Sequence, residues 1–194
     1  MSKKIKLLAF CGSLRKDSLN KKLVQQASQA AIEAGAEVKF FDIGEYSLPL
    51  YNQEIEDSNG LPENARQIKK LMIESDGFII ASPEYNSSIS APLKNLIDWA
   101  SRKEGDEESL VAFKEKTALL LAASPGALGG LRGLVHLRSI LSNLGMLLLP
   151  DQYALSKAHE AFNESAELVS SEVREKLVVL TKKLISLTSR LKAS

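Results

Sequence analysis

Cysteine is almost absent from this chain of 194 residues, which contains Cys11 and no other. A single thiol excludes an intramolecular disulfide and suits a reducing compartment. Long apolar runs are also missing, since none approaches the roughly 18 residues that a membrane span requires. The N-terminal run Ile5 to Cys11 is interrupted by Lys6 and is too short for a signal peptide. We therefore expect a cytoplasmic protein with no membrane partner.

The chain also lacks an excess of charge of either sign, with 25 basic and 24 acidic residues and a net charge of +1. This balance argues against nucleic-acid binding driven by phosphate contacts and against a polybasic membrane-surface protein. Hydrophobic residues make up 44% of the chain and charged residues 25%, as in globular proteins that bury a core. The length predicts a single domain over residues 1–194.

Short apolar runs alternate with helical patterns along the chain. Unbroken apolar runs suit strands buried on both faces, and apolar positions three or four residues apart suit helices that pack on them. The expected strands are 5–11, 37–43, 77–82, 117–123 and 146–149. The expected helices carry apolar positions between residues 19 and 34, 62 and 72, 90 and 101, 134 and 144, and 169 and 191. Segments 44–61 and 102–116 show no regular period, so we expect a long loop and a charged connection.

Strands that alternate with helices predict an α/β fold with a parallel sheet covered on both faces. The pattern suits a flavodoxin-like three-layer sandwich with a five-stranded parallel sheet in the order 2-1-3-4-5. In that order, the loops after the first, third and fourth strands gather at one edge of the sheet. These loops, near 12–20, 83–90 and 124–130, carry the polar and glycine residues of the candidate site.

The first of these loops leads from a strand into the N-terminus of a helix, where free N–H groups and the helix dipole favour anions. Ser13, Ser18 and Asn20 add hydrogen-bond donors, and Arg15 adds a forked cation that suits phosphate oxygens. The loop lacks the glycine pattern of dinucleotide and triphosphate sites, which favours a single phosphate monoester. The same residues also suit an ordinary connection in which Ser18 only caps the helix.

The other two loops have features that suit a flat ligand. Residues 83–88 offer the ring of Tyr85, amides and main-chain donors, which can pack against a heterocycle, although a tight turn with a surface tyrosine also explains them. The glycines of 124–130 permit close approach of the backbone to a ligand, although a flexible connection is again the alternative. Three such loops at one sheet edge favour a mononucleotide site with an aromatic head group.

The cysteine and the two histidines do not belong to any catalytic or metal-binding motif in the sequence. Cys11 is expected to be a buried structural thiol. Neither His136 nor His159 has the serine or carboxylate spacing of a triad or a metal cluster, so we expect a structural place for both and no metal site. Trp99 is expected in the core or at an interface, and the acidic run 104–108 at the solvated surface.

Three stretches together carry a family resemblance. They are Gly12-Ser13-Leu14-Arg15 with Ser18 and Asn20, Ser82-Pro83-Glu84-Tyr85-Asn86 with Pro92-Leu93-Lys94-Asn95 and Ile97-Asp98-Trp99, and Ser124-Pro125-Gly126 with Gly129-Gly130. These stretches resemble the phosphate loop, the flavin-ring signature and the third loop of the NAD(P)H-dependent FMN reductases, a flavodoxin-like family of chromate, quinone and azo-dye reductases. One departure is 87–91, where relatives often carry a bulkier residue after the asparagine, so the resemblance does not fix the shape of the substrate pocket.

The resemblance implies non-covalent FMN, NADH or NADPH as co-substrate, and two-electron reduction of quinones, azo or nitro compounds, chromate or free flavin. It implies that the phosphate contacts the first loop and that the isoalloxazine lies between 83–86 and 124–129. The implied cofactor-binding residues are Ser13, Leu14, Arg15, Ser18, Asn20, Pro83, Glu84, Tyr85, Asn86, Ser124, Gly126 and Gly129. It also implies a homodimer or homotetramer, for which helix 90–101 and loop 44–61 are the candidate contacts.

Two rival interpretations stay open. One is an FMN electron carrier or redox-sensing module without a substrate of its own, although carriers of the flavodoxin type are usually strongly acidic and this chain is neutral. The other is a protein that binds AMP or a similar monoester, which would be colourless because it holds no flavin.

Overall fold

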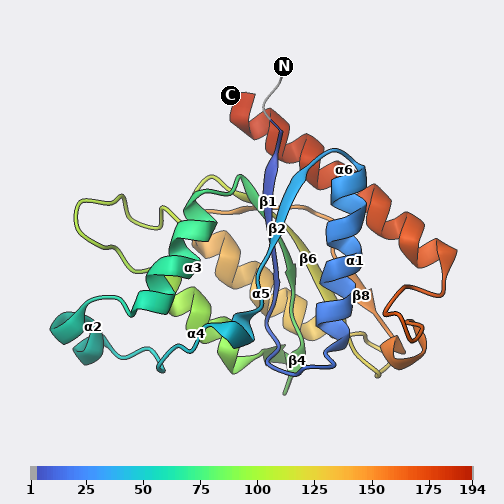
Figure 1. Ribbon diagram of the computed structural model, residues 1–194, viewed down its shortest axis with the longest axis horizontal. Coiled ribbons are helices and arrows are strands. Elements are labelled where there is room, and N and C mark those ends of the chain that lie inside the picture. Colours follow the sequence, from blue (N-terminus) through green and yellow to red (C-terminus); the bar gives the residue numbers. More distant parts are fainter. Residues whose placement is uncertain (1–3, 194) are drawn as a thin grey trace.

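The computed structural model describes residues 4–193, which form a central sheet between two layers of helices (Figure 1). The strands are β1 (Lys6–Cys11), β2 (Glu37–Phe40), β3 (Gly77–Ala81), β4 (Glu84–Tyr85), β5 (Ser88–Ile89), β6 (Thr117–Ala123), β7 (Leu147–Leu148) and β8 (Tyr153–Leu155). The helices are α1 (Leu19–Glu33), α2 (Gln53–Asn59), α3 (Glu63–Ile73), α4 (Ala91–Ala100), α5 (Leu131–Asn143) and α6 (Ser171–Ala193), with 3-10 turns at Ile43–Glu45 and Ala158–Glu160.

The main sheet is parallel and has the order β2-β1-β3-β6-β7, with β8 also paired to β6. Since β6 is the fourth predicted strand and β7 and β8 share the fifth position, the predicted order 2-1-3-4-5 is confirmed. The fifth strand is divided in two. Pro150 lies between its segments and has no N–H to donate to the ladder. The flavodoxin-like order leaves the C-terminal ends of β1, β3 and β6 side by side.

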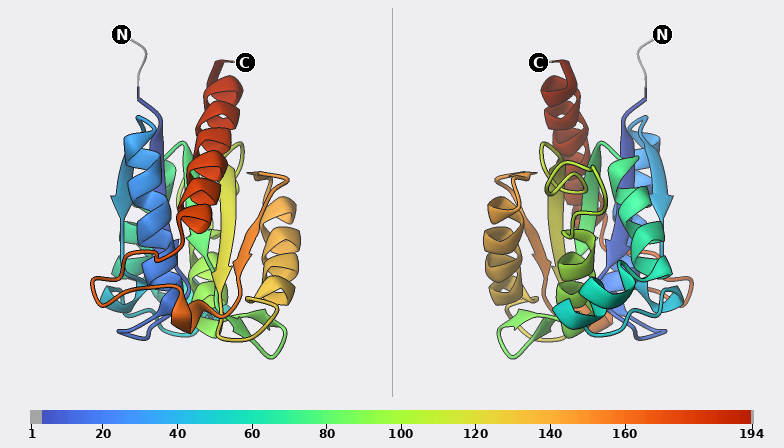
Figure 2. Two further views of the ribbon diagram at one scale, coloured as in Figure 1. Left: turned by 90° about the vertical axis from the view of Figure 1, so that its right-hand side faces the viewer. Right: turned by 90° about the vertical axis from the view of Figure 1, so that its left-hand side faces the viewer.

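Alternation along β1 builds the core on both faces of the sheet. Leu7 and Ala9 pack with α1 and α6, whereas Leu8 and Phe10 pack with α3, α4 and α5. The two side views show α1 and α6 in front of the strands on one side, and α3 and α4 on the other (Figure 2). Both faces of β3 and β6 are therefore buried, as their unbroken apolar sequences predict.

The prediction of a long loop over 44–61 is wrong in part, because this segment contains regular structure. The predicted strand 37–43 ends at Phe40, and a 3-10 turn and helix α2 follow it. The side chain of Asn52 caps α2 by accepting a hydrogen bond from the N–H of Glu54 at 2.9 Å. The sequence gives no helical period here because α2 has seven residues and buries none of them.

This segment is fastened to α4 by polar contacts. The indole N–H of Trp99 donates to the carbonyl of Pro49 at 2.8 Å, and the side chain of Asn95 accepts from the N–H of Tyr51 at 2.8 Å. The rings of Tyr51 and Trp99 also meet edge to face, with their centroids 5.0 Å apart. Trp99 is therefore a core residue, which is one of the two places expected for it.

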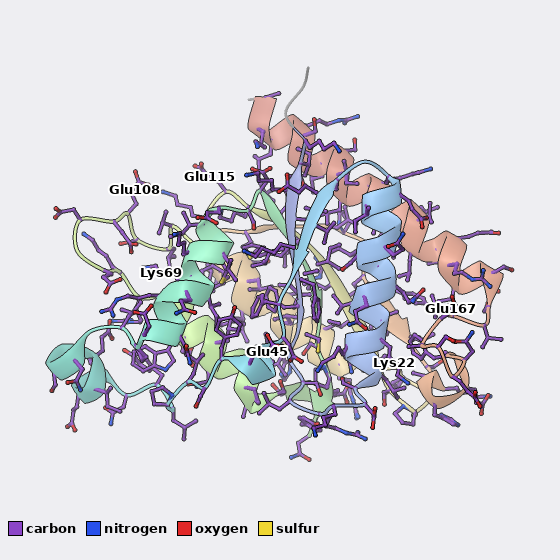
Figure 3. The ribbon with its side chains drawn as sticks, viewed as in Figure 1. Lys22, Glu45, Lys69, Glu108, Glu115 and Glu167 are labelled. Atoms are coloured by element: carbon purple, nitrogen blue, oxygen red, sulfur yellow. The ribbon has the colours of Figure 1, made fainter. Side chains whose placement is uncertain are left out.

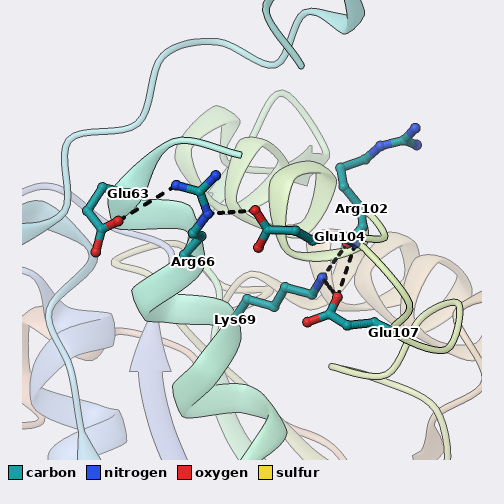
Figure 4. Close-up of polar contacts among 6 residues, drawn as sticks. All are labelled: Glu63, Arg66, Lys69, Arg102, Glu104 and Glu107. Atoms are coloured by element: carbon teal, nitrogen blue, oxygen red, sulfur yellow. Dashed lines mark hydrogen bonds and ion pairs between the residues drawn. The ribbon is translucent and has the colours of Figure 1, made fainter. Parts of the chain in front are cut away.

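The charged connection 102–116 lacks helices and strands, as expected, and ion pairs hold it to α3 (Figure 4). Arg66 pairs with Glu104 at 2.6 Å, and the buried ammonium of Lys69 pairs with Glu107. Figure 3 places Glu108 on the outer part of this connection, away from Glu45 near the loops at the C-terminal edge of the sheet. The acidic run is thus a surface feature that does not reach those loops. Among residues 4–193, no helix has both the length and the apolar character needed to cross a membrane.

Candidate functional site

The loop after β1 places two hydroxyls and a guanidinium at the start of α1. Ser13 accepts a hydrogen bond from the N–H of Arg15 at 3.3 Å, and Ser18 caps α1 by accepting from the N–H of Lys21 at 3.3 Å. Each serine uses an oxygen lone pair in these bonds, so its own O–H stays available to donate to an anion. The loop passes close to α4 at Gly12, where a Cβ would lie 2.7 Å from that of Leu93.

A small cavity shows that the three predicted loops meet. It has a volume of about 100 Å³ and is lined by Ser13, Arg15 and Ser18 of the first loop, where the sequence predicts a phosphate; after that prediction we call it the phosphate cavity. Its walls come from the loops after β1, β3 and β6, and they are formed by Ser13, Arg15, Ser18, Leu19, Asn20, Pro83, Glu84, Tyr85, Ala123, Ser124 and Pro125. The three loops lie far apart in the sequence, and the sheet order brings them together at its C-terminal edge.

The second loop is a β-hairpin, which the sequence did not predict. Strands β4 and β5 pair antiparallel and are joined by Asn86 and Ser87, whose φ angles are 50° and 65°. Two successive residues with positive φ identify a type I′ turn, which suits the twist of a two-residue hairpin. The hairpin lacks the Asn-Gly or Asp-Gly signal typical of this turn. It holds Tyr85 at the surface, where the side chain is 51% exposed.

The third loop and the hairpin line a larger cavity of about 510 Å³, which we call the ring cavity because the resemblance predicts a flavin ring beside these two segments. Its walls are Glu84, Asn86, Ser87, Ser124, Gly126, Ala127, Leu128, Gly129, Gly130 and Arg132. It shares Glu84 and Ser124 with the phosphate cavity, so the two adjoin. The volume lies within the range of small-molecule sites in proteins.

The backbone path of the third loop requires a glycine at position 129. Its φ is 61°, and a Cβ there would lie 2.8 Å from main-chain atoms of Ala154 and Leu155 in β8. The loop is also bonded to β8, since the N–H of Ser124 donates to the carbonyl of Leu155 at 3.1 Å. These contacts fix the part of the ring cavity wall formed by Ser124 and Gly129 against β8.

Glu84 joins the hairpin to α5. Its carboxylate accepts from Nε of Arg132 at 2.8 Å and from the N–H of Gly133 at 3.2 Å. Burial alone raises the pKa of Glu84, but the bonds from Gly133 and Arg132 outweigh this effect and hold the pKa below its ordinary value. Glu84 is therefore an ionised group that takes part in a structural contact between the hairpin and helix α5.

Asn20 makes a comparable link between the first and third loops. Its side-chain N–H donates to the carbonyl of Ala123 at 2.9 Å, and its side-chain oxygen accepts from the N–H of Ala123 at 2.9 Å. The amide is buried, and these two bonds direct it toward the end of β6. The sequence predicts Asn20 as a phosphate donor; in the structure its side-chain amide fastens α1 to the end of β6, where the third loop begins.

Eleven of the twelve cofactor-binding residues expected from the sequence line one or both of these cavities. The exception is Leu14, which lines a separate cavity of about 370 Å³ together with residues of 43–50 and the first turn of α4. Sequence reasoning missed Arg132 and Ala123. Arg132 follows the paired glycines of the third loop, but its partner Glu84 is 48 residues away, and nothing near either residue reveals the contact.

The reactive side chains outside the cavities have structural partners. Cys11 is buried, as expected, and burial raises the pKa of its thiol. His136 lies on α5 with Nδ1 3.0 Å from the hydroxyl of Ser88, so it contacts β5 of the hairpin. Within residues 4–193, no three His, Cys, Asp or Glu side chains are grouped as metal ligands would be.

Comparison with known proteins gives one consistent result. A family model described as NADPH-dependent FMN reductase matches residues 5–160. An NAD(P)H:quinone oxidoreductase from Solanum tuberosum is 33% identical over 193 residues, which cover 97% of this chain and 95% of the relative. A 2-hydroxy-1,4-benzoquinone reductase from a Burkholderia species is 33% identical over 175 residues, which cover 89% and 90%. The solved structure of FerB, a flavoenzyme NAD(P)H:(acceptor) oxidoreductase from Paracoccus denitrificans, has a TM-score of 0.78 and 26% identity, with 96% and 98% coverage.

Proposed function

This chain belongs to the NADPH-dependent FMN reductase family, and from that premise we propose that it is an FMN-containing NAD(P)H:quinone oxidoreductase. The observation that carries the proposal is the meeting of three distant loops on two adjoining cavities, one lined by hydroxyls and a guanidinium and the other wider. This arrangement fits a mononucleotide that is held by its phosphate at one end and its ring at the other. Both relatives described above are named as reductases of quinones, which favours an enzyme over an electron carrier.

The phosphate cavity has the donors that a monoester dianion needs. The hydroxyls of Ser13 and Ser18 and the guanidinium of Arg15 would hold the phosphate at the N-terminus of α1, where the helix dipole favours negative charge. Asn20 would keep this loop in register with the third loop through its bonds to Ala123. We therefore assign the first three residues to phosphate binding and Asn20 chiefly to positioning.

The ring cavity would orient the flavin, which when bound supplies the redox chemistry by accepting a hydride from NAD(P)H and passing two electrons to a quinone. The turn at Asn86 and Ser87 and the main chain of 124–130 would contact the edge of the ring. Pro83 and Tyr85 line the adjoining phosphate cavity, so we propose that they contact the cofactor between its ring and its phosphate, and not the ring alone as the resemblance implies. The chain's contribution is orientation, since no side chain is needed as a nucleophile. We accordingly assign no catalytic residue.

We further propose that the whole chain acts as one domain and that it forms at least a homodimer. The cavity beside Leu14 supports a contact through 44–61 and helix 90–101, because it has apolar walls and Leu50 at its rim is 78% exposed. A Leu50→Glu variant, examined by sedimentation, is expected to dissociate. The buried single thiol suits a reducing compartment, which supports a cytoplasmic location.

The test of the function starts from the visible spectrum of the purified protein. We expect a yellow protein, or a colourless one that turns yellow and gains a flavin spectrum when FMN is added. Stopped-flow mixing with NADH or NADPH should bleach the flavin, and a quinone should restore its colour over many turnovers. A protein that takes up no FMN, or a bound flavin that neither nicotinamide reduces, would contradict the proposal.

A further inference from the structure

A carboxylate and a guanidinium meet at the wall of the ring cavity. Glu84, on the hairpin, and Arg132, on α5, both line it, and their closest nitrogen and oxygen atoms are 2.6 Å apart. The side chain of Glu84 is 9% exposed, whereas that of Arg132 is 59% exposed. A nearly buried negative charge beside the cavity is therefore balanced by a positive charge that water can reach.

The start of α5 brings a second positive contribution to the same place. The N-cap residue, Gly130, has no side chain to accept hydrogen bonds from the first N–H groups of the helix. Glu84 supplies the missing acceptor from another segment, since its second oxygen accepts from the N–H of Gly133. The positive end of the helix dipole is thus neutralised by Glu84 and is not left free to act on the ring cavity.

The close packing at this point depends on a glycine. A Cβ on Gly133 would lie 3.4 Å from the Cβ of Glu84 and 3.2 Å from the carbonyl oxygen of Ser88. The helix can therefore approach the hairpin closely enough for the Glu84 carboxylate to reach a main-chain N–H. The geometry keeps the charges of Glu84, Arg132 and the helix terminus together at one wall of the cavity.

We propose that the Glu84–Arg132 pair sets the reduction potential of the flavin by keeping the wall of the ring cavity close to electrically neutral. The inference rests on the proposed function. In hydride transfer the nicotinamide C–H bond breaks, and its hydrogen and both electrons pass to the flavin. The nicotinamide becomes a cation, and the flavin gains one negative charge. A negative charge near the ring disfavours the reduced form, and a positive charge favours it.

Removing one member of the pair should therefore shift the potential in a direction that depends on which charge is lost. Glu84→Gln leaves Arg132 and the helix terminus unbalanced, so the midpoint potential of bound FMN should rise. Arg132→Gln removes the positive charge that pairs with the Glu84 carboxylate, so the midpoint potential of bound FMN should fall. Arg132→Lys keeps the charge and should stay near the wild-type value. A tenfold change in the affinity for reduced relative to oxidised flavin corresponds to about 30 mV for a two-electron couple.

The experiment is a spectroscopic redox titration of the FMN-loaded wild-type protein and these variants. Lys183→Gln is the matched control, because Lys183 pairs with Asp151 in an exposed ion pair and lines neither cavity; its potential should not change. Shifts of the same sign in Glu84→Gln and Arg132→Gln, as a purely structural role would give, would overturn the proposal. So would the absence of a shift in both.

If Glu84→Gln does not retain FMN, the two Arg132 variants decide the question. An unchanged or higher potential in Arg132→Gln would then overturn the proposal, and a lower one that Arg132→Lys reverses would support it. Failure of the proposed function is recognised separately, because the wild-type protein would show no flavin spectrum before any potential is measured, and that outcome would defeat both proposals.

Discussion

The side-chain amide of Asn20 pairs with the main chain of Ala123 through two hydrogen bonds, each 2.9 Å long. At the end of β6 the amide makes the pair of main-chain hydrogen bonds that a residue of a neighbouring strand would make. The first residues of α1 are thereby joined to the start of the third loop. A shift of α1 away from the third loop would therefore have to break both bonds.

Replacing Asn20 with aspartate should weaken this connection with little change in side-chain shape. The new carboxylate would face the carbonyl of Ala123 with an acceptor in place of a donor, and Asn20 is buried. We expect a loss of about 1–3 kcal/mol in the free energy of unfolding of the apoprotein, together with weaker FMN binding. Urea denaturation and an FMN titration measure the two effects.

Asn64→Asp is the matched control for this change. The amide of Asn64 also donates to a carbonyl, that of Ser47, but this hydrogen bond is exposed to solvent and Asn64 is only half-buried. Its replacement should change stability by no more than about 0.5 kcal/mol. Equal losses in the free energy of unfolding of the two variants would show that the buried bonds of Asn20 stabilise the fold no more than the exposed bond of Asn64 does.

Glycine at position 87 should stabilise the hairpin. Ser87 has a φ of 65°, in the left-handed region that costs residues with a Cβ about 1 kcal/mol and costs glycine little. Ser87→Gly should therefore raise the free energy of unfolding by up to about 1 kcal/mol. Ser58→Gly, inside helix α2, should lower it by a similar amount. A destabilising effect at position 87 would mean that its hydroxyl makes a necessary contact.

Alanine at position 129 should disrupt the third loop. Its Cβ would lie 2.8 Å from the main chain of β8, which cannot move without breaking the pairing with β6. We expect a loss of more than about 2 kcal/mol and a loss of FMN binding, measured by thermal unfolding with and without FMN. Gly35→Ala is the control that separates the cost of a positive φ from the cost of a steric clash. Its φ is 97°, but among residues 4–193 no atom other than those of Gly35 and its two chain neighbours lies within 4 Å of a Cβ there, so only the smaller conformational cost should appear.

The sequence predicted the sheet order because that order depends on features repeated along the whole chain. Apolar runs such as 77–82 and 117–123 are buried on both faces in the structure, as their composition requires. The parts that it missed depend on single contacts. Helix α2 buries no residue and so leaves no period, and the hairpin turn uses Asn86 and Ser87 where glycine would have been the recognisable signal.

The candidate site, too, was predicted where it depends on the topology and was missed where it depends on single contacts. The loops could be placed at one edge of the sheet because the topology alone requires it. The pairing of Glu84 with Arg132 depends on how α5 is turned about its axis, which only packing against the sheet decides. Leu14 was grouped with the cavity residues because of its neighbours in the sequence, yet it lines the separate cavity next to α4.

Acid should loosen the segment around α2. Burial opposes ionisation of Glu56, but the bonds from Arg102 at 2.9 Å and from the Tyr51 hydroxyl at 2.8 Å outweigh it and keep its pKa below the ordinary value. A pKa that is lower in the folded state stabilises the fold above the unfolded-state value of about 4.3. That contribution is lost as the pH falls through the lower, folded-state value.

Hydrogen exchange at the amides of α2, followed from neutral pH into acid and corrected for intrinsic rates, measures this effect. Protection should fall in acid in the wild-type protein. In Glu56→Gln it should already be low at neutral pH and change less with acid. Glu54→Gln, on the same helix, should behave as the wild type. An unaltered pH profile in Glu56→Gln would assign the acid sensitivity to another group.

The central claim is that the loop after β1 holds the phosphate of a mononucleotide, and a comparison of FMN with riboflavin, which has no phosphate, tests it most directly. Fluorescence titrations of the apoprotein should show FMN bound at least about tenfold more tightly. Arg15→Ala should weaken FMN binding by about 10- to 100-fold and leave riboflavin unaffected, whereas Lys16→Ala should bind both as the wild type does. Equal affinities of the wild-type protein for FMN and riboflavin would contradict the account.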